Sequence, residues 1–343
     1  MKQRLLAWLA SPCCSADLKV DLRESRQDPN SEIGTGSLVC AACASRYLIV
    51  DGVPRLSSLA EPEDKVAKTR DSFAWEWSRY PGSLPEDRRI FLEETQIPAE
   101  EFQGKLVLDA GCGMGRYSLV ALSLGAEVVS VDLSESLSRL APRAQAEPRL
   151  HVVQGDLLRP PFKKGIFDIV YSQGVLHHTS DTRAAFIQAA RLVKPRGQLS
   201  VWLYGKGGRF EEFSTNPLRS DRGWVARHRR LAWLAVRVRH AFSDFVRCFT
   251  TRLPMRGSYA LSYVLAALGA FPGLKYLTFS VHPGFKVRVI ENFDWISPPF
   301  QYHHTKEELV SWFEAAGYEV LRILPHGLVP KPGVLGRRRE DAR

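Results

Sequence analysis

Cysteine is scarce in this sequence, with six residues among 343. So few thiols exclude a disulfide-rich scaffold, and four of the six lie within the first 43 positions, which indicates a local cluster. Acidic residues are also outnumbered, 37 against 47 lysines and arginines, so the formal net charge is +10. This excess favours an anionic partner, either nucleic acid or a membrane surface, but it does not define the fold.

The first residues lack a complete secretory signal. The apolar run at residues 5–10 has six residues, whereas a signal-peptide core has about 7–15. Pro12 stands where a small residue would precede cleavage. Residues 257–274 are 18 uncharged positions, the lower limit of a membrane span, but they include Gly, Ser and Pro. We expect a cytoplasmic protein, with association at a membrane surface left open.

The composition is that of a folded chain, 45% hydrophobic and 24% charged, and its length fits about two domains. From residue 105, apolar strand patterns alternate with helical ones. Strands are predicted at 106–108, 127–131, 150–153, 167–171 and 198–204, and helices at 116–124 and 182–193. This alternation predicts an α/β fold with a doubly wound, mostly parallel sheet covered on both faces.

The sequence divides into four regions. We expect a cysteine-bearing domain at 1–60, a helical connector at 61–103, an α/β domain at 104–204 and 291–335, and a basic helical insertion at 205–290. A capping-box pattern, Thr305 with Glu308, predicts a helix over 305–316, and a strand over 318–324 follows it. The charged residues 336–343 are expected to fray.

A glycine-rich segment, residues 109–115 (Asp-Ala-Gly-Cys-Gly-Met-Gly), follows a strand and opens a helix. Glycines let the backbone approach a ligand, and a helix amino terminus offers N–H groups to an anionic carboxylate. The spacing is G-x-G-x-G, not the G-x-G-x-x-G of dinucleotide sites. Asp109 at its start suits a cationic ligand group.

Two more acids follow the next strands. Asp132 lies 23 residues after Asp109 at the end of the second strand, where a carboxylate accepts both hydroxyls of a ribose. Gly155 and Asp156 follow the third strand and suit an adenine amino group. From these residues alone, a dinucleotide-binding dehydrogenase remains the alternative.

Four motifs in order resemble the class I S-adenosylmethionine-dependent methyltransferases: residues 107–116, residues 131–134 with 154–156, residues 167–178, and residues 192–199. The resemblance implies a seven-stranded Rossmann-like methyltransferase sheet and S-adenosyl-L-methionine as cofactor. The cofactor-binding residues that it implies are Asp109, Gly111, Cys112, Gly113, Gly115, Asp132, Leu133, Gly155, Asp156, Leu157 and Gln173. A cofactor-binding scaffold without turnover is a further alternative.

The amino-terminal cysteines form a second motif. Cys40 and Cys43 make a C-x-x-C knuckle, and Cys13 and Cys14 lie upstream. With residues 46–54, this pattern resembles the zinc-ribbon-like tRNA-methyltransferase activators, which begin C-P-x-C where this chain has Ser11. The resemblance implies a structural zinc held by Cys14, Cys40 and Cys43, with Cys13 as the candidate fourth ligand. The alternative is a ribbon fold without metal.

The insertion is basic and amphipathic. Residues 219–256 hold ten arginines and two aspartates. Helical spacing places six apolar side chains on one face: Leu231, Leu234, Val238, Phe242, Phe245 and Phe249. Such a helix suits peripheral contact with anionic lipid or the entrance for an oily substrate. A solvated lid over the active site is the alternative.

Methyl transfer from a sulfonium is an in-line displacement, so catalysis is mostly positioning. A hydroxyl or carbon-acid acceptor also needs a base, and histidine suits neutral pH. His178 follows the fourth strand and His303 precedes the late helix, so these are the two catalytic candidates. Trp75, Trp77 and Tyr80 either close over the ligands or bury the connector.

The sequence lacks the motif that nucleic-acid amino-methyltransferases use, and this bears on the class of methyl acceptor. Nucleic-acid amino-methyltransferases of this class carry (Asp/Asn)-Pro-Pro-aromatic after the fourth strand, and residues 172–175 here read Ser-Gln-Gly-Val. We therefore expect a small, lipophilic acceptor, quinone-like or a secondary metabolite, methylated on oxygen or carbon. An RNA methyltransferase, with the arginines of the insertion gripping phosphates, remains the competing hypothesis.

Overall fold

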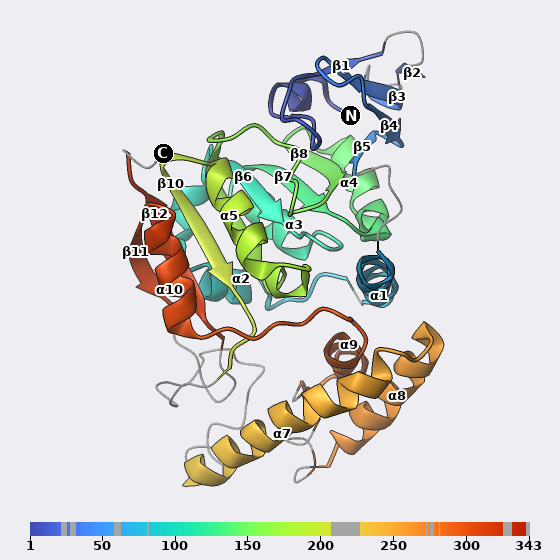
Figure 1. Cartoon of the computed structure of the whole chain (residues 1–343), viewed down its shortest axis with the longest axis vertical. Coiled ribbons are helices and arrows are strands. Elements are labelled where there is room, and N and C mark those ends of the chain that lie inside the picture. Colours follow the sequence, from blue (N-terminus) through green and yellow to red (C-terminus); the bar gives the residue numbers. More distant parts are fainter. Residues whose placement is uncertain are drawn as a thin grey trace.

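The computed structural model describes residues 1–21, 26–27, 32–57, 63–80, 82–206, 227–271, 274, 278–280, 282–324 and 331–340. The α/β domain lies in the middle of the molecule (Figure 1). The amino-terminal strands lie at one end of it and helices α7 and α8 at the other (Figure 1). Residues 207–226 of the predicted insertion, with Arg219 and Arg222, fall outside the described residues.

In the described residues, seven consecutive strands of the sheet form its central part. In sheet order they are β8 (Leu150–Gly155), β7 (Glu127–Asp132), β6 (Leu106–Ala110), β9 (Phe167–Gln173), β10 (Val193–Trp202), β12 (Gly333–Arg338) and β11 (Tyr318–Ile323). The pairs from β8 to β10 are parallel, while β12 is antiparallel to both neighbours. The order reverses between β6 and β9, which is where ligands bind in such sheets. This confirms the predicted Rossmann-like fold.

Helices cover both faces of the sheet, because the parallel strands carry buried apolar side chains on both faces. They are α3 (Arg116–Ser123), α4 (Ala141–Ala146), α5 (Thr182–Leu192) and α10 (Lys306–Ala315). The predicted capping box at Thr305 and Glu308 is present and starts α10. Short 3-10 helices occur at η1 (Gln3–Ala7), η2 (Ala99–Phe102), η3 (Glu135–Arg139) and η4 (Leu176–His178).

The prediction that residues 336–343 fray was wrong for 336–338. These residues belong to β12, which lies between β10 and β11. Gly336 packs so closely that a Cβ there would lie 2.5 Å from the Phe313 ring. Charged side chains at Arg337 and Arg338 concealed a strand whose preceding part, Val334 and Leu335, is 2% exposed.

The amino-terminal region is joined to the central sheet. Its strands are β1 (Leu18–Val20), β2 (Arg26–Gln27), β3 (Ile33–Cys40), β4 (Arg46–Val50) and β5 (Val53–Leu56). β5 pairs in parallel with β8 through Arg55 and Leu56, so the small antiparallel sheet extends the large one. Met1, Leu5 and Leu9 belong to the same apolar core as the central strands.

The connector supplies two helices, α1 (Asp64–Arg79) and α2 (Asp87–Thr95). The insertion supplies α7 (Arg229–Thr250), α8 (Met255–Leu268) and α9 (Phe285–Ile296). The predicted boundary at residue 290 falls inside α9, which packs against α1, α7 and α8. In the part of the chain that the structure describes, no helix has the length and apolarity needed to cross a membrane.

Candidate functional site

The glycine loop connects β6 to α3 at the carboxyl edge of the sheet. Gly111, Gly113 and Gly115 have φ of +90°, +55° and +89°, which L side chains rarely adopt. At Gly111 a Cβ would also lie 2.3 Å from the Val175 side chain. The loop is anchored by N–H groups of Gly111 and Cys112, which donate to Val131 O at 2.8 and 3.0 Å. The glycines are therefore required by the path of the loop.

Asp132 lies at the end of β7, beside this loop. Its Oδ2 accepts from Gly113 N at 2.8 Å, and its Oδ1 accepts from Ser134 N and Oγ at 2.8 and 2.7 Å. Burial raises the pKa of Asp132, and the hydrogen bonds from Ser134 and Gly113 oppose that rise. The glycine loop is thus hydrogen-bonded to Asp132, and the sequence assigned both to the same ligand.

Asp109 lies beneath the loop and not at its surface. Its side chain is buried, 3% exposed, and Oδ2 accepts from Ser118 Oγ at 2.6 Å. Burial raises its pKa to about 7. Ser130 Oγ donates to Ser118 Oγ at 2.8 Å, so a short chain of hydroxyls ties β6, β7 and α3 together. This geometry fits a residue that shapes the loop.

The other predicted cofactor residues lie along the same edge. Leu133 O accepts from Gln154 Nε2 at 3.0 Å, and Asp156 Oδ1 accepts from Leu158 N at 2.9 Å. Gln173 Nε2 donates to Ser200 Oγ at 2.8 Å, while its buried Oε1 has no partner. Three more residues are packed against neighbours: Cys112 and Leu157 are buried, and Gly155 has room only for a hydrogen because of Pro161.

One face of α1 covers the loop. Trp77 packs on Gly113, where a Cβ would lie 3.0 Å from the indole ring. Tyr80 stacks on the Arg116 guanidinium at 4.6 Å, and Arg139 donates to Trp77 O and Tyr80 O. Trp77 therefore packs on the glycine loop and Tyr80 on the start of α3, while closure over a ligand stays a prediction. Trp75 points elsewhere, toward Tyr259 at 6.0 Å.

The same face of α1 reaches His178. The Phe73 ring meets the His178 ring edge-on at 4.9 Å. His178 Nδ1 lies 2.9 Å from Phe300 O, so the neutral ring donates through Nδ1 and keeps a lone pair on Nε2. Burial lowers the pKa of His178 to about 3, and the ring is neutral at physiological pH. Nε2 has no hydrogen-bond partner and faces Asp294 Oδ1 at 3.8 Å.

Asp294 and Glu76 make this neighbourhood acidic. Asp294 lies on α9 and accepts a short hydrogen bond from the Tyr204 hydroxyl, while burial raises its pKa to about 6. Glu76 is 5% exposed, and its Oε2 has no partner. Burial, and then the charge of Asp294, raise the Glu76 pKa well above its usual value. A buried acid, Glu76, a partly buried acid, Asp294, and a neutral imidazole therefore lie in one neighbourhood.

The two histidines predicted as catalytic converge on Tyr204. The Tyr204 ring lies 5.4 Å from the His178 ring and 6.2 Å from the His303 ring. His177 serves the packing instead, because it is fully buried, stacks on Tyr204 at 4.0 Å and accepts from Tyr204 N through Nδ1. His178 faces the Asp294 carboxylate at 3.8 Å.

A buried arginine of the insertion holds the segment opposite His178. Arg247 on α7 is 8% exposed, and its guanidinium donates to the carbonyls of Pro298 and Pro299 at 2.8 and 3.4 Å. Thr250 Oγ1 donates to Ile296 O at 2.8 Å in the same region. The insertion therefore fixes the chain that presents the Phe300 carbonyl to His178.

Sequence reasoning missed Tyr204, Asp294 and Glu76. Tyr204 comes just after β10, at the sheet edge where ligands bind, and that rule alone indicated it. Asp294 was detectable as an acid between Phe293 and Trp295 on a helix whose other face is apolar. Glu76 gave no local signal, because its burial arises only when α1 packs against α9.

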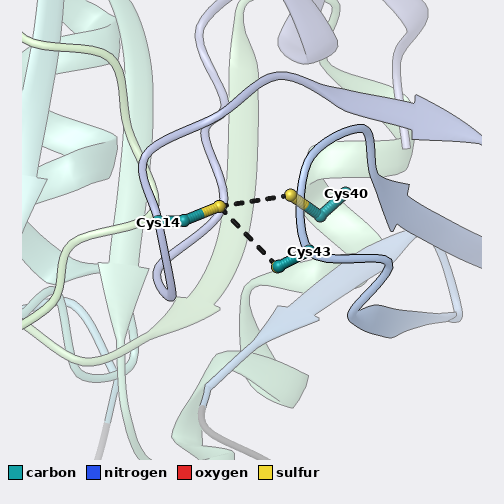
Figure 2. A group of neighbouring side chains, drawn as sticks. All are labelled: Cys14, Cys40 and Cys43. Atoms are coloured by element: carbon teal, nitrogen blue, oxygen red, sulfur yellow. Dashed lines mark hydrogen bonds between the residues drawn. The ribbon is translucent and has the colours of Figure 1, made fainter.

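The amino-terminal cysteines form a separate cluster. Cys14 Sγ lies 3.4 Å from Cys40 Sγ and 3.6 Å from Cys43 Sγ (Figure 2). Tetrahedral zinc with bonds of about 2.3 Å requires sulfurs about 3.8 Å apart, so this spacing fits the metal. Cys13 is not one of the three sulfurs that the described residues group together, but its thiol interacts with that of Cys43. Ser11 Oγ shares a 3.1 Å hydrogen bond with the Tyr47 hydroxyl.

We propose that this cluster holds one structural zinc, and we expect replacement of Cys40 by serine to remove it. Loss of the metal should lower the free energy of unfolding by ~2 kcal/mol or more, because zinc binds the folded state and stabilises it relative to the unfolded chain. Elemental analysis of the purified protein and thermal melts measure both effects. Cys248→Ser, at an exposed thiol on α7, is the control. A metal-free wild-type protein that melts like the variant would contradict the zinc assignment.

Comparison with known proteins identifies the central part of the chain. Residues 108–201 match the family described as methyltransferase domain. The malonyl-[acyl-carrier protein] O-methyltransferase of Serratia marcescens is 33% identical over 94 residues, 27% of this chain and 36% of that protein. The mitochondrial ubiquinone biosynthesis O-methyltransferase of Schizosaccharomyces pombe is 32% identical over 133 residues, 36% of this chain and 48% of that protein. The chain spans less than half the length of each of these two relatives.

Among solved structures, phosphoethanolamine N-methyltransferase 2 of Haemonchus contortus in complex with S-adenosyl-L-methionine is 24% identical, with a TM-score of 0.37. That match covers 52% of this chain and 42% of the other. Residues 108–201 are thus similar to the methyltransferase domain family, and the strand order already described shows a Rossmann-like fold. The match spans the glycine loop, Asp132 and His178.

Proposed function

We propose that this protein is an S-adenosylmethionine-dependent methyltransferase that acts on a hydroxyl or carbon acid of a small, lipophilic acceptor. The observation that carries the proposal is that one face of α1 contacts both the glycine loop and His178. Trp77 covers the glycine loop, while Phe73, one turn earlier, contacts His178. A cofactor on the loop and an acceptor at His178 are thus neighbours under one helix face.

The residues of the loop fit this cofactor. Positive-φ glycines give the backbone room, the half-buried Asp132 suits ribose hydroxyls, and the unpartnered Oε1 of Gln173 lies at the end of the neighbouring strand. Asp132 and the loop would hold the nucleoside and methionine parts, with Asp156 near the adenine. When bound, S-adenosylmethionine supplies an electrophilic methyl group on a sulfonium.

The protein itself contributes a proton acceptor, His178, that is largely shielded from solvent. The carbonyl of Phe300 fixes His178 in the tautomer with a free Nε2, and this atom faces Asp294. A hydroxyl against Nε2 transfers its proton to the ring, and an ionised Asp294 stabilises the imidazolium. Tyr204 orients Asp294 by its hydrogen bond. Phe73 lies against the His178 ring and Trp295 against the Tyr204 ring, and these apolar neighbours favour an acceptor with a lipophilic body.

Methyl-labelled S-adenosylmethionine, incubated with the protein and fractionated cell extract, tests the acceptor class. We expect label in the organic-soluble fraction. Label in RNA would overturn the proposal and support the nucleic-acid alternative, with the arginines of the insertion on phosphates. Cofactor binding without label in any fraction would favour the scaffold alternative.

The rate of methyl transfer is expected to rise with pH around a midpoint near 6. Burial raises the pKa of Asp294 to about 6, so below that pH the carboxyl is neutral and cannot stabilise a protonated His178. Above it the carboxylate is present and the rate reaches a plateau. The measurement is a pH profile under saturating cofactor.

Asp294→Asn should remove this step from the profile and lower the plateau by roughly tenfold or more. Glu314→Gln, at an exposed acid on α10, is the matched control and should keep the wild-type profile. A wild-type rate that is flat between pH 5 and 7 would show that Asp294 does not take part.

A further inference from the structure

The insertion carries an exposed apolar stripe that no contact in the described structure covers. Its members on α7 are each 53–61% exposed: Leu231, Leu234, Val238, Phe242, Phe245 and Phe249. They recur at three- and four-residue spacing and so form one line along the helix. Neighbouring rings touch along it, Phe242 with Phe245 at 6.4 Å and Phe245 with Phe249 at 5.4 Å. These six side chains are called the α7 stripe below.

The opposite face of α7 is the one that packs on the protein. Ser243, Arg247 and Thr250 are at most 8% exposed, and Arg247 and Thr250 bond to the 296–301 segment. The carboxyl-terminal part of α7 is therefore fixed with Ser243, Arg247 and Thr250 inward and with the apolar side chains of the α7 stripe outward. A surface helix usually turns its apolar side chains toward the core, whereas the α7 stripe faces outward. Packing within this chain therefore does not account for the stripe.

More exposed apolar side chains follow in the rest of the insertion. They are Leu253, Tyr263, Val264, Leu268, Phe271, Leu274 and Phe285, each 37–61% exposed. They belong to α8, to the chain on either side of it and to the start of α9. A monomeric protein rarely leaves so many large apolar side chains exposed in one region, so the region is an interaction surface.

Charge identifies the partner. Residues 219–256 carry ten arginines and two aspartates. Among the described side chains, Arg227 and Arg230 are exposed at the start of α7 and Arg252 and Arg256 just past its end. The apolar line is thus bounded by cations at both ends. An apolar face with a cationic border matches a bilayer with anionic headgroups, which accepts both parts at once.

Two other occupants fit less well. A second copy of this chain would bring the same cationic surface against itself across a two-fold interface, and the like charges would repel. Single-stranded RNA would use arginines and stacking aromatics, but Leu231, Leu234 and Val238 offer it nothing. We therefore propose that α7 and the start of α8 dock the protein on the surface of an anionic lipid bilayer, with the α7 stripe entering the boundary of the acyl chains.

The surface also lies close to the candidate acceptor site. α7 presents the stripe on one side, and from the other side Arg247 holds the segment that carries the Phe300 carbonyl. A bilayer at this face is therefore one helix away from His178. This gives a lipophilic acceptor a short route, although the docking proposal itself does not depend on the proposed reaction.

Co-sedimentation of the full-length protein with vesicles tests the proposal without any substrate. The probes are vesicles of phosphatidylcholine alone and of phosphatidylcholine with phosphatidylglycerol. We expect binding to the anionic vesicles that is at least tenfold stronger than binding to the neutral ones and that weakens as salt is raised. Equal or absent binding to both vesicle types would overturn the proposal.

Two variants distinguish binding through the α7 stripe from binding through any exposed apolar side chain. Phe245→Glu should lower partitioning on anionic vesicles by roughly tenfold or more, because one large apolar group no longer enters the bilayer. Leu48→Glu, on β4 at the other end of the molecule, is 60% exposed against 61% for Phe245 and should bind like the wild type. Circular dichroism of both variants establishes that they are folded.

The competing occupants have their own outcomes. Light scattering that shows a wild-type dimer, a monomeric Phe245→Glu variant and vesicle binding unchanged by the substitution would assign the face to a second copy. Retention on RNA that the substitution of Arg230 by glutamate removes, with no vesicle binding, would assign it to nucleic acid. Either result contradicts the bilayer proposal, and a failure of methyl transfer has no bearing on it.

Discussion

Replacing Asp132 by alanine is expected to lower the affinity for S-adenosylmethionine by roughly 10²-fold or more. A carboxylate that accepts two ribose hydroxyls contributes about 1.5–3 kcal/mol for each charge-assisted hydrogen bond, and 1.4 kcal/mol is tenfold in affinity. The substitution also removes the acceptor for Gly113 N and Ser134, so the loop loses a support. Equilibrium dialysis with labelled cofactor measures the change.

Asp132→Asn separates these two effects. The amide keeps an oxygen that can accept from Ser134 N or from Gly113 N, but it has no negative charge for the ribose. We expect both its affinity and its melting temperature to lie between those of the wild type and the alanine variant, because one of the two acceptor atoms is lost. If the alanine variant bound the cofactor like the wild type, the ribose assignment at the end of β7 would be wrong.

His178→Gln is expected to lower the rate of methyl transfer by roughly 10²-fold or more, the usual contribution of general base catalysis. Glutamine keeps a donor for the Phe300 carbonyl but has no basic nitrogen to face Asp294. Cofactor affinity should stay the same, because His178 contacts Phe73, Tyr204 and the 300 region and not the glycine loop. The readout is the single-turnover rate at saturating cofactor.

His228→Gln, at an exposed histidine just before α7, is the matched control and should retain full activity. His303→Gln should cause a smaller loss than His178→Gln, because the His303 ring lies 6.2 Å from the Tyr204 ring and the His178 ring lies 5.4 Å from it. A fully active His178→Gln protein would move the proton acceptor elsewhere, with Asp294 as the next candidate.

Local patterns were enough to predict the glycine loop and the strands around it. The loop depends on a few successive backbone angles, and only glycine satisfies φ near +90° at positions 111 and 115 without strain. The position of Asp132 beside the loop was also predictable, because the carboxyl ends of neighbouring parallel strands lie at the same edge of the sheet. These features lie close together in sequence, so their spacing carries the information.

The acceptor side of the site depends on contacts between distant segments. His178 meets Phe73 across about a hundred residues, and Asp294 comes from α9. No spacing rule indicates that α1 packs on both the glycine loop and α9, because this requires the whole fold. The same holds for β12, which enters the sheet between β10 and β11 out of chain order.

The amphipathic helix of the insertion shows the opposite case. Its apolar positions were read correctly from sequence, as six side chains on one face. What the pattern did not give was the direction of that face, since a core-facing stripe and a solvent-facing stripe have the same period. The exposure of Phe245 and the burial of Arg247 decide it.

A calorimetric titration with S-adenosylmethionine tests the central claim most directly. We predict saturable binding at one site, competition by S-adenosylhomocysteine, and weaker binding in the Asp132→Ala variant. A protein that gives no heat with S-adenosylmethionine but binds NADH at the same loop would contradict the account, and the glycine segment would then belong to a dinucleotide site.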